Sequence, residues 1–245
     1  MTLWRLEWLR LTRTKRWLIL FGVYGVFGIL GPLTARYLPE IIDRLGDVQV
    51  DLPELTPADG VAQYVGNAQQ IGVLAVAFVA AAALAFDSNT EMSVFLRTRA
   101  TVRNILTPRF VVNAAAAAGA FVFGALIAYI GTGLLLEWLD FGDFLVGLAL
   151  HAWYLVFVVA LIALMAGIFR NVVGVALSSI GVLIILGILT LLSPIARWLP
   201  SALVGSIDVL LRGGPFDVLP ALVVTTVLIV ALPAIAVARL EAREV

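Results

Sequence analysis

The chain has no cysteine, one histidine and one lysine among its 245 residues. The absence of cysteine excludes disulfide bonds, thiolate metal sites and cysteine nucleophiles. Charged residues make up only 13% of the sequence, whereas hydrophobic residues make up 62% and the mean hydropathy is +1.07. A soluble globular domain averages roughly 45–50% apolar residues. The composition therefore indicates an integral membrane protein.

Six stretches of the chain contain no charged residue, and each is at least nineteen residues long. A helix of about 20 residues crosses a hydrocarbon core of roughly 30 Å, and uninterrupted apolar runs are not typical of membrane β-strands. The sequence therefore predicts an all-α integral membrane protein, with a single six-helix transmembrane domain over residues 1–245. The first run exceeds the apolar segment of a signal peptide, about 7–15 residues, so we expect it to be a retained span. The predicted spans are residues 17–35, 60–86, 110–136, 144–169, 171–196 and 218–238.

Basic residues are distributed unevenly between the two sides of this predicted domain. Six spans place both termini on one side, and that side holds twelve of the sixteen basic residues but only five of the sixteen acidic residues. The positive-inside rule therefore predicts cytoplasmic N- and C-termini and a cytoplasmic loop between the second and third spans. The expected location is the cell (plasma) membrane, with the lipid bilayer as the immediate surroundings.

Residues 1–16, MTLWRLEWLRLTRTKR, predict a helix that lies in the membrane interface. Trp4 and Trp8 fall on one stripe at helical spacing, which suits tryptophan at headgroup level. Arg5 and Arg13 lie off that stripe and are expected to face anionic lipid or a partner. The simpler alternative is a basic flank that only orients the chain.

Small residues in the first and fifth predicted spans indicate close helix packing. Gly22, Gly25 and Gly28 recur every third residue, and Gly174 and Ser178 are one helical turn apart. Small side chains let helix backbones approach each other closely in lipid. Packing within the chain is the simpler interpretation of both patterns. The sharper prediction is that these five residues form a seam between two subunits.

The segment between the fifth and sixth spans, residues 193–217, is too polar to cross the membrane but carries several large apolar side chains. Pro200 and the pair Gly213–Gly214 interrupt it. We predict two short helices that form an outer re-entrant hairpin.

The loop between the second and third spans is predicted to form a helix of its own. Ser88 and Glu91 have the spacing of a capping box. Thr107 followed by Pro108 is typical of the start of the next helix. We therefore expect a cytoplasmic coupling element over residues 88–106.

This loop also concentrates arginine, with four within thirteen positions. Arg99 and Arg103 are one turn apart on the side of Leu96, and arginine stems pack on apolar surface while the guanidinium pairs with carboxylates. These features predict a docking surface for a partner protein. The alternative is charge that only orients the chain and contacts lipid phosphates. The predicted contact residues are Glu91, Phe95, Leu96, Arg97, Arg99 and Arg103.

With these features the chain resembles the permease subunits of ABC-2 type transporters over nearly its whole length. That family combines six spans, an amphipathic N-terminal helix and a loop with a Glu, a Leu-Leu pair, a Pro-x-Ser-Arg element and a Gly-Lys. Here Glu91, Phe95–Leu96, Arg103 and Pro108–Arg109 occupy comparable places. The outer segment before the last span is similar to the family's re-entrant hairpin.

The chain departs from the family pattern at two points of the loop. Ala100 and Val102 stand where Pro and Ser are usual, and Pro-Arg replaces the closing Gly-Lys about one residue early. The resemblance implies a pair of permease subunits with two cytoplasmic ABC ATPase subunits, which would bind ATP and Mg²⁺. No cofactor is expected in this chain itself, and no nucleic-acid partner.

The chain lacks the residues for ion coupling and for ATP binding, which is consistent with a permease that depends on a separate ATPase subunit. The predicted spans contain no Asp, Glu, Lys or Arg that could form an ion-coupled relay. A P-loop needs G-x-x-x-x-G-K-[ST], but Lys15 is followed by Arg16, so the chain is not expected to be an enzyme. We expect an exporter of an amphipathic or lipophilic substrate.

Two alternatives remain at the level of sequence. One is a membrane anchor or assembly platform without transport, and the other is a membrane-embedded enzyme. The second is disfavoured because there is no H-E-x-x-H motif and the single histidine, His151, is expected to be hydrogen-bonded within the bundle.

Overall fold

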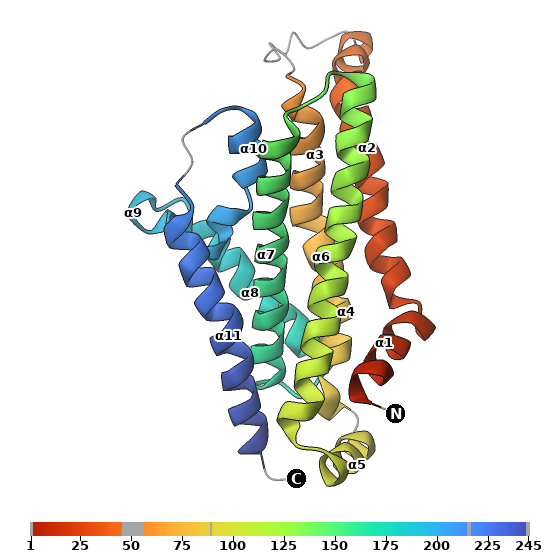
Figure 1. The fold of residues 1–245 in the computed structure, drawn as a ribbon, viewed down its shortest axis with the longest axis vertical. Helices are drawn as coiled ribbons and strands as arrows, with labels where there is room; N and C mark the ends of the chain where they lie inside the picture. The colour runs from red at the N-terminus through yellow and green to blue at the C-terminus, as the bar shows by residue number, and fades with distance from the viewer. Residues whose placement is uncertain (1, 46–55, 89, 215–216, 244–245) are drawn as a thin grey trace.

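The computed structural model describes residues 2–45, 56–88, 90–214 and 217–243, which are almost entirely helical and contain no strand (Figure 1). A π-helical turn, Ala68–Gly72, joins α3 to α4, and short 3₁₀ helices occur at Phe86–Ser88 and Pro200–Leu203. The α-helices are α1 (Leu3–Arg13), α2 (Arg16–Leu45), α3 (Ala58–Asn67), α4 (Val73–Leu84), α5 (Thr90–Arg99), α6 (Val102–Leu135), α7 (Phe141–Ala166), α8 (Val172–Leu189), α9 (Ser193–Ala196), α10 (Ser206–Leu211) and α11 (Leu219–Glu241).

Among the residues that the structure describes, six helices are long and apolar enough to cross a membrane, which agrees with the predicted number of spans. Each overlaps the apolar run from which it was predicted, because a continuous run of this length is most stable as a helix when its backbone must be satisfied internally. The six are Arg16–Leu38, Ala58–Leu84, Val102–Leu135, Phe141–Ala166, Val172–Leu189 and Leu219–Glu241.

The third of these helices begins earlier than the sequence predicted. Helix α6 starts at Val102, and the hydroxyl of Thr101 accepts a hydrogen bond from the backbone N–H of Asn104 at 3.3 Å. Thr107 is therefore not the N-cap, and Pro108 lies inside the helix rather than at its first position. Thr101 and Thr107 are equally suitable capping residues, and the break at the earlier one ends the loop helix at Arg99. The coupling element predicted over residues 88–106 is thus two helical pieces.

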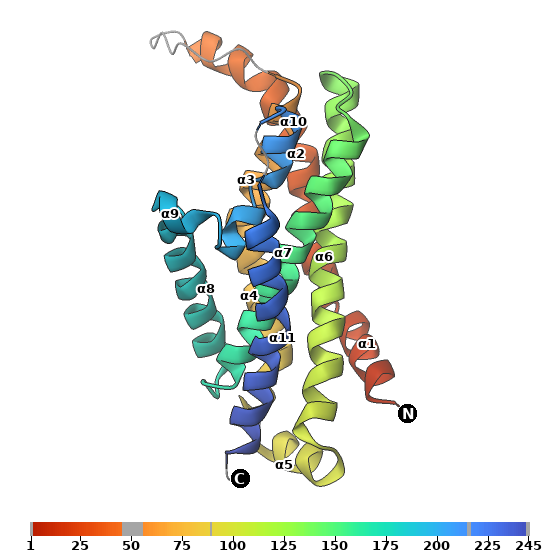
Figure 2. The ribbon, with the colours of Figure 1, turned by 60° about the vertical axis from the view of Figure 1, so that its left-hand side comes forward.

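The bundle has one end that carries α5 and the last turn of α11, with α1 beside it; we call this the basal end (Figure 1). Helices α2, α6 and α7 and the α3–α4 helix form the packed centre, and α2 makes its most extensive contact with α6. Helix α8 lies at the periphery, apart from α2 and α6 (Figure 2). Four of its 18 residues are buried, against fifteen of the 26 residues of α7.

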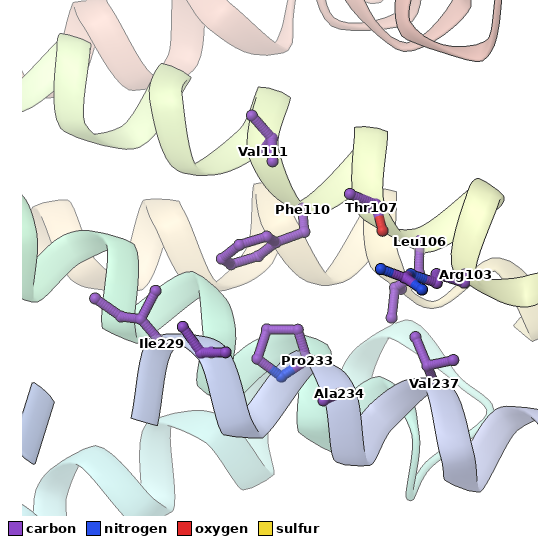
Figure 3. A pocket seen from close by; sticks show the side chains of 10 residues that line it. Arg103, Leu106, Thr107, Phe110, Val111, Ile229, Pro233, Ala234 and Val237 are labelled. Atoms are coloured by element: carbon purple, nitrogen blue, oxygen red, sulfur yellow. The ribbon is translucent and has the colours of Figure 1, made fainter. Parts of the chain in front are cut away.

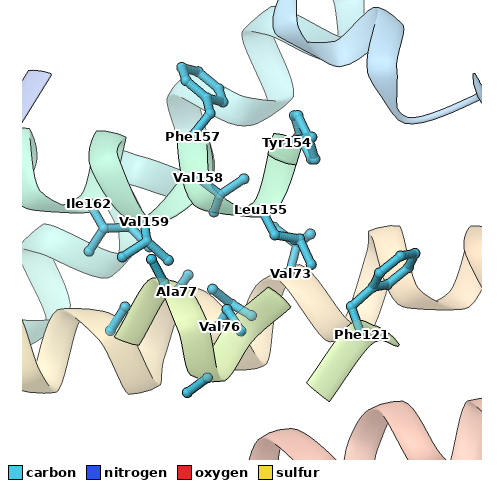
Figure 4. Close-up of a cluster of buried hydrophobic side chains, with 14 of the residues drawn as sticks. Val73, Val76, Ala77, Phe121, Tyr154, Leu155, Phe157, Val158, Val159 and Ile162 are labelled. Atoms are coloured by element: carbon cyan, nitrogen blue, oxygen red, sulfur yellow. The ribbon is translucent and has the colours of Figure 1, made fainter. Parts of the chain in front are cut away.

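The core is mainly apolar and combines small and branched side chains with buried aromatic rings. On α4 the buried residues Val76 and Ala77 face α7, where Val158, Val159 and Ile162 are buried (Figure 4). In a bilayer, where the lipid is as apolar as these side chains, such a core is stabilised by close packing rather than by removal of water.

The segment predicted as a hairpin forms three short helical pieces: α9, the 3₁₀ helix that Pro200 begins, and α10. Leu203 and Ile207 are fully buried. Gly213, with φ of +65°, follows the end of α10, a conformation that favours glycine. Hydrogen bonds that Arg212 donates to the carboxylates of Asp208 and Asp59 raise the pKa of its guanidinium. The segment is therefore held against α7 and the start of α3, and its re-entrant nature remains a prediction.

Candidate functional site at the basal end

Helix α5 presents a mixed stripe on its exposed side. Val94 and Phe95 follow Glu91 by three and four residues, and Arg99 follows Phe95 by four, which places the four residues on one side of the helix. All four are exposed, Phe95 to 57%. The Arg99 guanidinium carbon lies 5.6 Å from the centre of the Phe95 ring. We call these four residues the α5 stripe. Leu96, predicted to belong to the same surface, is only partly exposed.

Arg97 has a different role from its neighbours on α5. Its guanidinium pairs with Asp87 at 3.1 Å and donates to the backbone carbonyls of Leu240 at 3.0 Å and Arg243 at 3.4 Å. Arg243 in turn pairs with Asp87 at 3.0 Å and donates to the carbonyl of Gly167 at 2.8 Å. This basal clamp connects α5 to the ends of α7 and α11. Arg97, predicted as a partner contact, is thus engaged within the chain.

Arg103 also lies away from the α5 stripe, because the helix break at Ala100 and Thr101 places it in the first turn of α6. Its side chain lines a groove of about 500 Å³ between α6 and α11 (Figure 3). Of the predicted partner contacts, the structure brings together Glu91, Phe95 and Arg99.

Helix α1 is anchored to the bundle by a buried ion pair that the sequence analysis missed. The Glu7 carboxylate accepts a hydrogen bond from Nε of Arg109 at 3.0 Å, and the two residues are 5% and 3% exposed. Arg109 also donates to the carbonyl of Ala83 at 3.0 Å. Leu11 is buried on the same side of α1. One signal was present in the sequence, since Glu7 is the only acidic residue in a strongly basic N-terminus.

The predicted interface residues of α1 lie on its other sides. Trp4 and Trp8 are exposed to 48% and 58%, and Arg5 and Arg13 are exposed as well. The two tryptophans remain available to lipid headgroups, while the buried face is formed by Glu7 and Leu11.

The glycines of the predicted seam divide into two groups. A methyl group added at Gly28 would meet the backbone of Gly124, and one at Gly25 would come within 3.1 Å of the Phe123 ring, so both glycines pack against α6 of the same chain. For Gly25 and Gly28 the structure therefore supports the simpler interpretation, which is packing within the chain. At Gly22 an added methyl would meet open space.

On α8 the predicted seam residues are near an open apolar face. A methyl at Gly174 would meet only the side chain of Asn171, which caps the same helix. The Ser178 hydroxyl donates to the carbonyl of Val175 at 3.2 Å. Next to them Val173 and Leu177 are each 57% exposed. This face is not used for packing within the described chain.

A polar cluster lies in the packed centre of the bundle, around Phe121. The ring of His151 stacks on Phe121 with a centroid distance of 4.1 Å and an interplanar angle of 8°, and its Nδ1 lies 3.2 Å from the carbonyl oxygen of Val204. A carbonyl can only accept, so Nδ1 carries the proton. The prediction that His151 is hydrogen-bonded within the bundle is confirmed. Tyr64 donates to the carbonyl of Phe121 at 2.6 Å.

The π-helical turn brings two amides into the same region. Gln69 donates to the hydroxyl of Tyr154 at 3.2 Å, and with Gln70 it lines a groove of about 400 Å³ between the second and fifth spans. The opposite wall includes Leu183 and Ile184 of α8. π-Helical turns are frequent at functional sites. No periodic pattern of residues predicted this one.

Within the described parts of the chain, no group of three or more His, Asp or Glu side chains could hold a metal ion. Neither a protein-family model, nor a curated protein, nor a solved structure matches the chain. What the chain does must therefore be inferred from its own residues.

Proposed function

We propose that this chain is the transmembrane permease subunit of an ATP-driven transporter of the ABC-2 type. The observation that carries the proposal is the α5 stripe, which lies at the basal end between the second and third candidate spans. An exposed phenylalanine beside an arginine is typical of protein interfaces, where aromatic and arginine side chains are enriched. Its acidic member, Glu91, adds a charge of the other sign for pairing with a partner.

In this proposal the basal end faces the cytoplasm, because the excess of arginine and lysine lies there. The α5 stripe would then contact an ABC ATPase subunit that binds ATP and Mg²⁺. An external energy source is consistent with the spans themselves. Asp59, Asp143 and Glu241, the acidic residues within the candidate spans, lie at or near helix ends. None of them is a mid-membrane carboxylate that could carry a proton or cation.

The proposed transporter contains two copies of this chain, or this chain and a related one, with the substrate route between them. The open face of α8 around Leu177 and Ser178 is the proposed seam. The groove that Gln69 and Gln70 line opens between α4 and α8 and combines two amides with apolar walls. This combination favours an amphipathic or lipophilic substrate, and export from the cell is the direction we propose.

The test is affinity purification of the full chain in mild detergent, followed by identification of the proteins that accompany it. We expect an ATPase with a P-loop to accompany the wild type and to be lost with Phe95→Asp. Phe141→Asp is the matched control, because Phe141 is 50% exposed near the opposite end of the bundle. An accompanying protein without a nucleotide-binding motif would favour an assembly platform instead.

A further inference from the structure

The groove between α6 and α11 combines an apolar length with a cation at one end. Its walls come from two helices at matching intervals, with Phe110 and Val111 on α6 and Ile229 and Val230 on α11 (Figure 3). Arg103 lies at the basal end, opposite Val237. The groove therefore has the polarity of a single lipid molecule, with a charged end and an apolar tail region.

Its length also suits a lipid. From Arg103 to Val111 is eight residues, or about 12 Å along the helix axis. One leaflet contributes half of a hydrocarbon core of roughly 30 Å, so the groove covers most of one leaflet. Val230, at the end of the groove farther from the basal end, is 70% exposed. A water-soluble partner that approached from the basal side could not reach and cover this side chain.

A second, polar hollow adjoins the groove at Arg103. It measures about 320 Å³ and is lined by Trp4 of α1 together with Arg103, Asn104, Thr107 and Pro108 of α6. Arg103 and Thr107 line both hollows. A phosphodiester at this boundary could accept hydrogen bonds from the guanidinium and the hydroxyl, with its tail on one side and its headgroup on the other. Trp4 is exposed at the same level, as is typical of tryptophan at the headgroup region.

The charge of Arg103 is the reason to expect an anionic lipid. Its guanidinium has no carboxylate partner among the described residues, in contrast to Arg97 and Arg109, which pair with Asp87 and Glu7. Arginine is well suited to phosphate, because its planar donors match the phosphate oxygens. A zwitterionic headgroup would bring a second cation close to Arg103.

We propose that the α6–α11 groove is a binding site for one anionic phospholipid, with the phosphate at Arg103 and Thr107, one acyl chain along Phe110 and Ile229, and the headgroup beside Trp4. This separates Arg103 from the proposed ATPase contact, and the site does not depend on whether the chain is a transporter.

The experiment uses the full chain in nanodiscs of phosphatidylcholine that contain a phosphatidylglycerol with a photoactivatable acyl chain. Adducts mapped by mass spectrometry should concentrate at Val111 and Val230. Unlabelled phosphatidylglycerol should compete about fivefold better than phosphatidylcholine, as expected for one arginine near a membrane surface. Arg103→Gln should abolish that preference, and Arg99→Gln, outside the groove, should retain it.

Two further arms test where the ligand lies. Ala234→Trp should fill the groove and remove the adducts although Arg103 is intact, and Val230→Trp serves the same purpose if the first variant does not fold. Soluble glycerol 3-phosphate should not compete, since it has no chain to bind. The proposal is overturned if both lipids compete equally in the wild type, if Arg103→Gln keeps the preference, if a folded groove-filling variant keeps the adducts, or if glycerol 3-phosphate displaces the probe.

Discussion

The buried ion pair between Glu7 and Arg109 allows the most quantitative prediction. Replacing Glu7 with Gln removes the carboxylate while Arg109 remains almost fully buried. Breaking one side of a buried pair costs roughly 3–5 kcal/mol, because a charge is left without its partner. Since the pair joins α1 to α6, we expect most of this cost to appear as detachment of α1, while the spans stay folded.

Hydrogen exchange measured by mass spectrometry reports this detachment directly. A loss of 3–5 kcal/mol corresponds to at least ~100-fold faster exchange at about 1.4 kcal/mol per tenfold, or to the rate of an unfolded peptide if α1 is less protected than that. Glu40→Gln is the control, because its ion pair with Arg36 at 3.4 Å is exposed on both sides and should contribute about 0–1 kcal/mol. The double replacement of Glu7 and Arg109 by leucine should restore much of the protection, as apolar replacements of buried pairs do. Unchanged exchange of α1 in Glu7→Gln would refute the reasoning.

Three further predictions concern packing, the basal clamp and the seam. Gly28→Ala should cost roughly 1–3 kcal/mol, as overpacking of a close contact does, whereas Gly22→Ala should leave the thermal unfolding midpoint nearly unchanged; similar midpoints for both would argue against the α2–α6 contact. Asp87→Asn should accelerate hydrogen exchange in the last turn of α11 by about 10–100-fold, because two charge-assisted pairs at roughly 1.5–3 kcal/mol each are weakened; unchanged exchange would show that the clamp does not hold this turn. Ser178→Leu should reduce cross-linking between two differently tagged copies, and Ala115→Leu on the exposed face of α6 should not; wild-type cross-linking in the first variant would rule out this seam.

The six spans could be predicted because they depend only on the length and apolarity of continuous runs. The hydrogen bond of His151 could also be expected, because a lone polar ring within such a run needs a partner. The start of α6 could not be predicted, since Thr101 and Thr107 offer the same capping chemistry and only the fold selects between them.

The local sequence pattern did not predict the different roles of the arginines between the second and third spans. Arg97, Arg99 and Arg103 lie within seven positions, but one joins a clamp, one is exposed on α5 and one lines a groove on α6. Their roles depend on the break between α5 and α6 and on residues more than a hundred positions away. The pair of Glu7 and Arg109, separated by 102 positions, is of the same kind.

Site-specific photo-crosslinking from the α5 stripe tests the central proposal most directly. A photoreactive amino acid at position 95, in the full chain in native membranes, should form a covalent adduct with a protein that carries a P-loop and hydrolyses ATP. The same amino acid at position 141, near the opposite end of the bundle, should not. Adducts at position 95 only with lipid, or only with a protein without a nucleotide-binding site, would contradict the assignment of this chain as the permease subunit of an ATP-driven transporter.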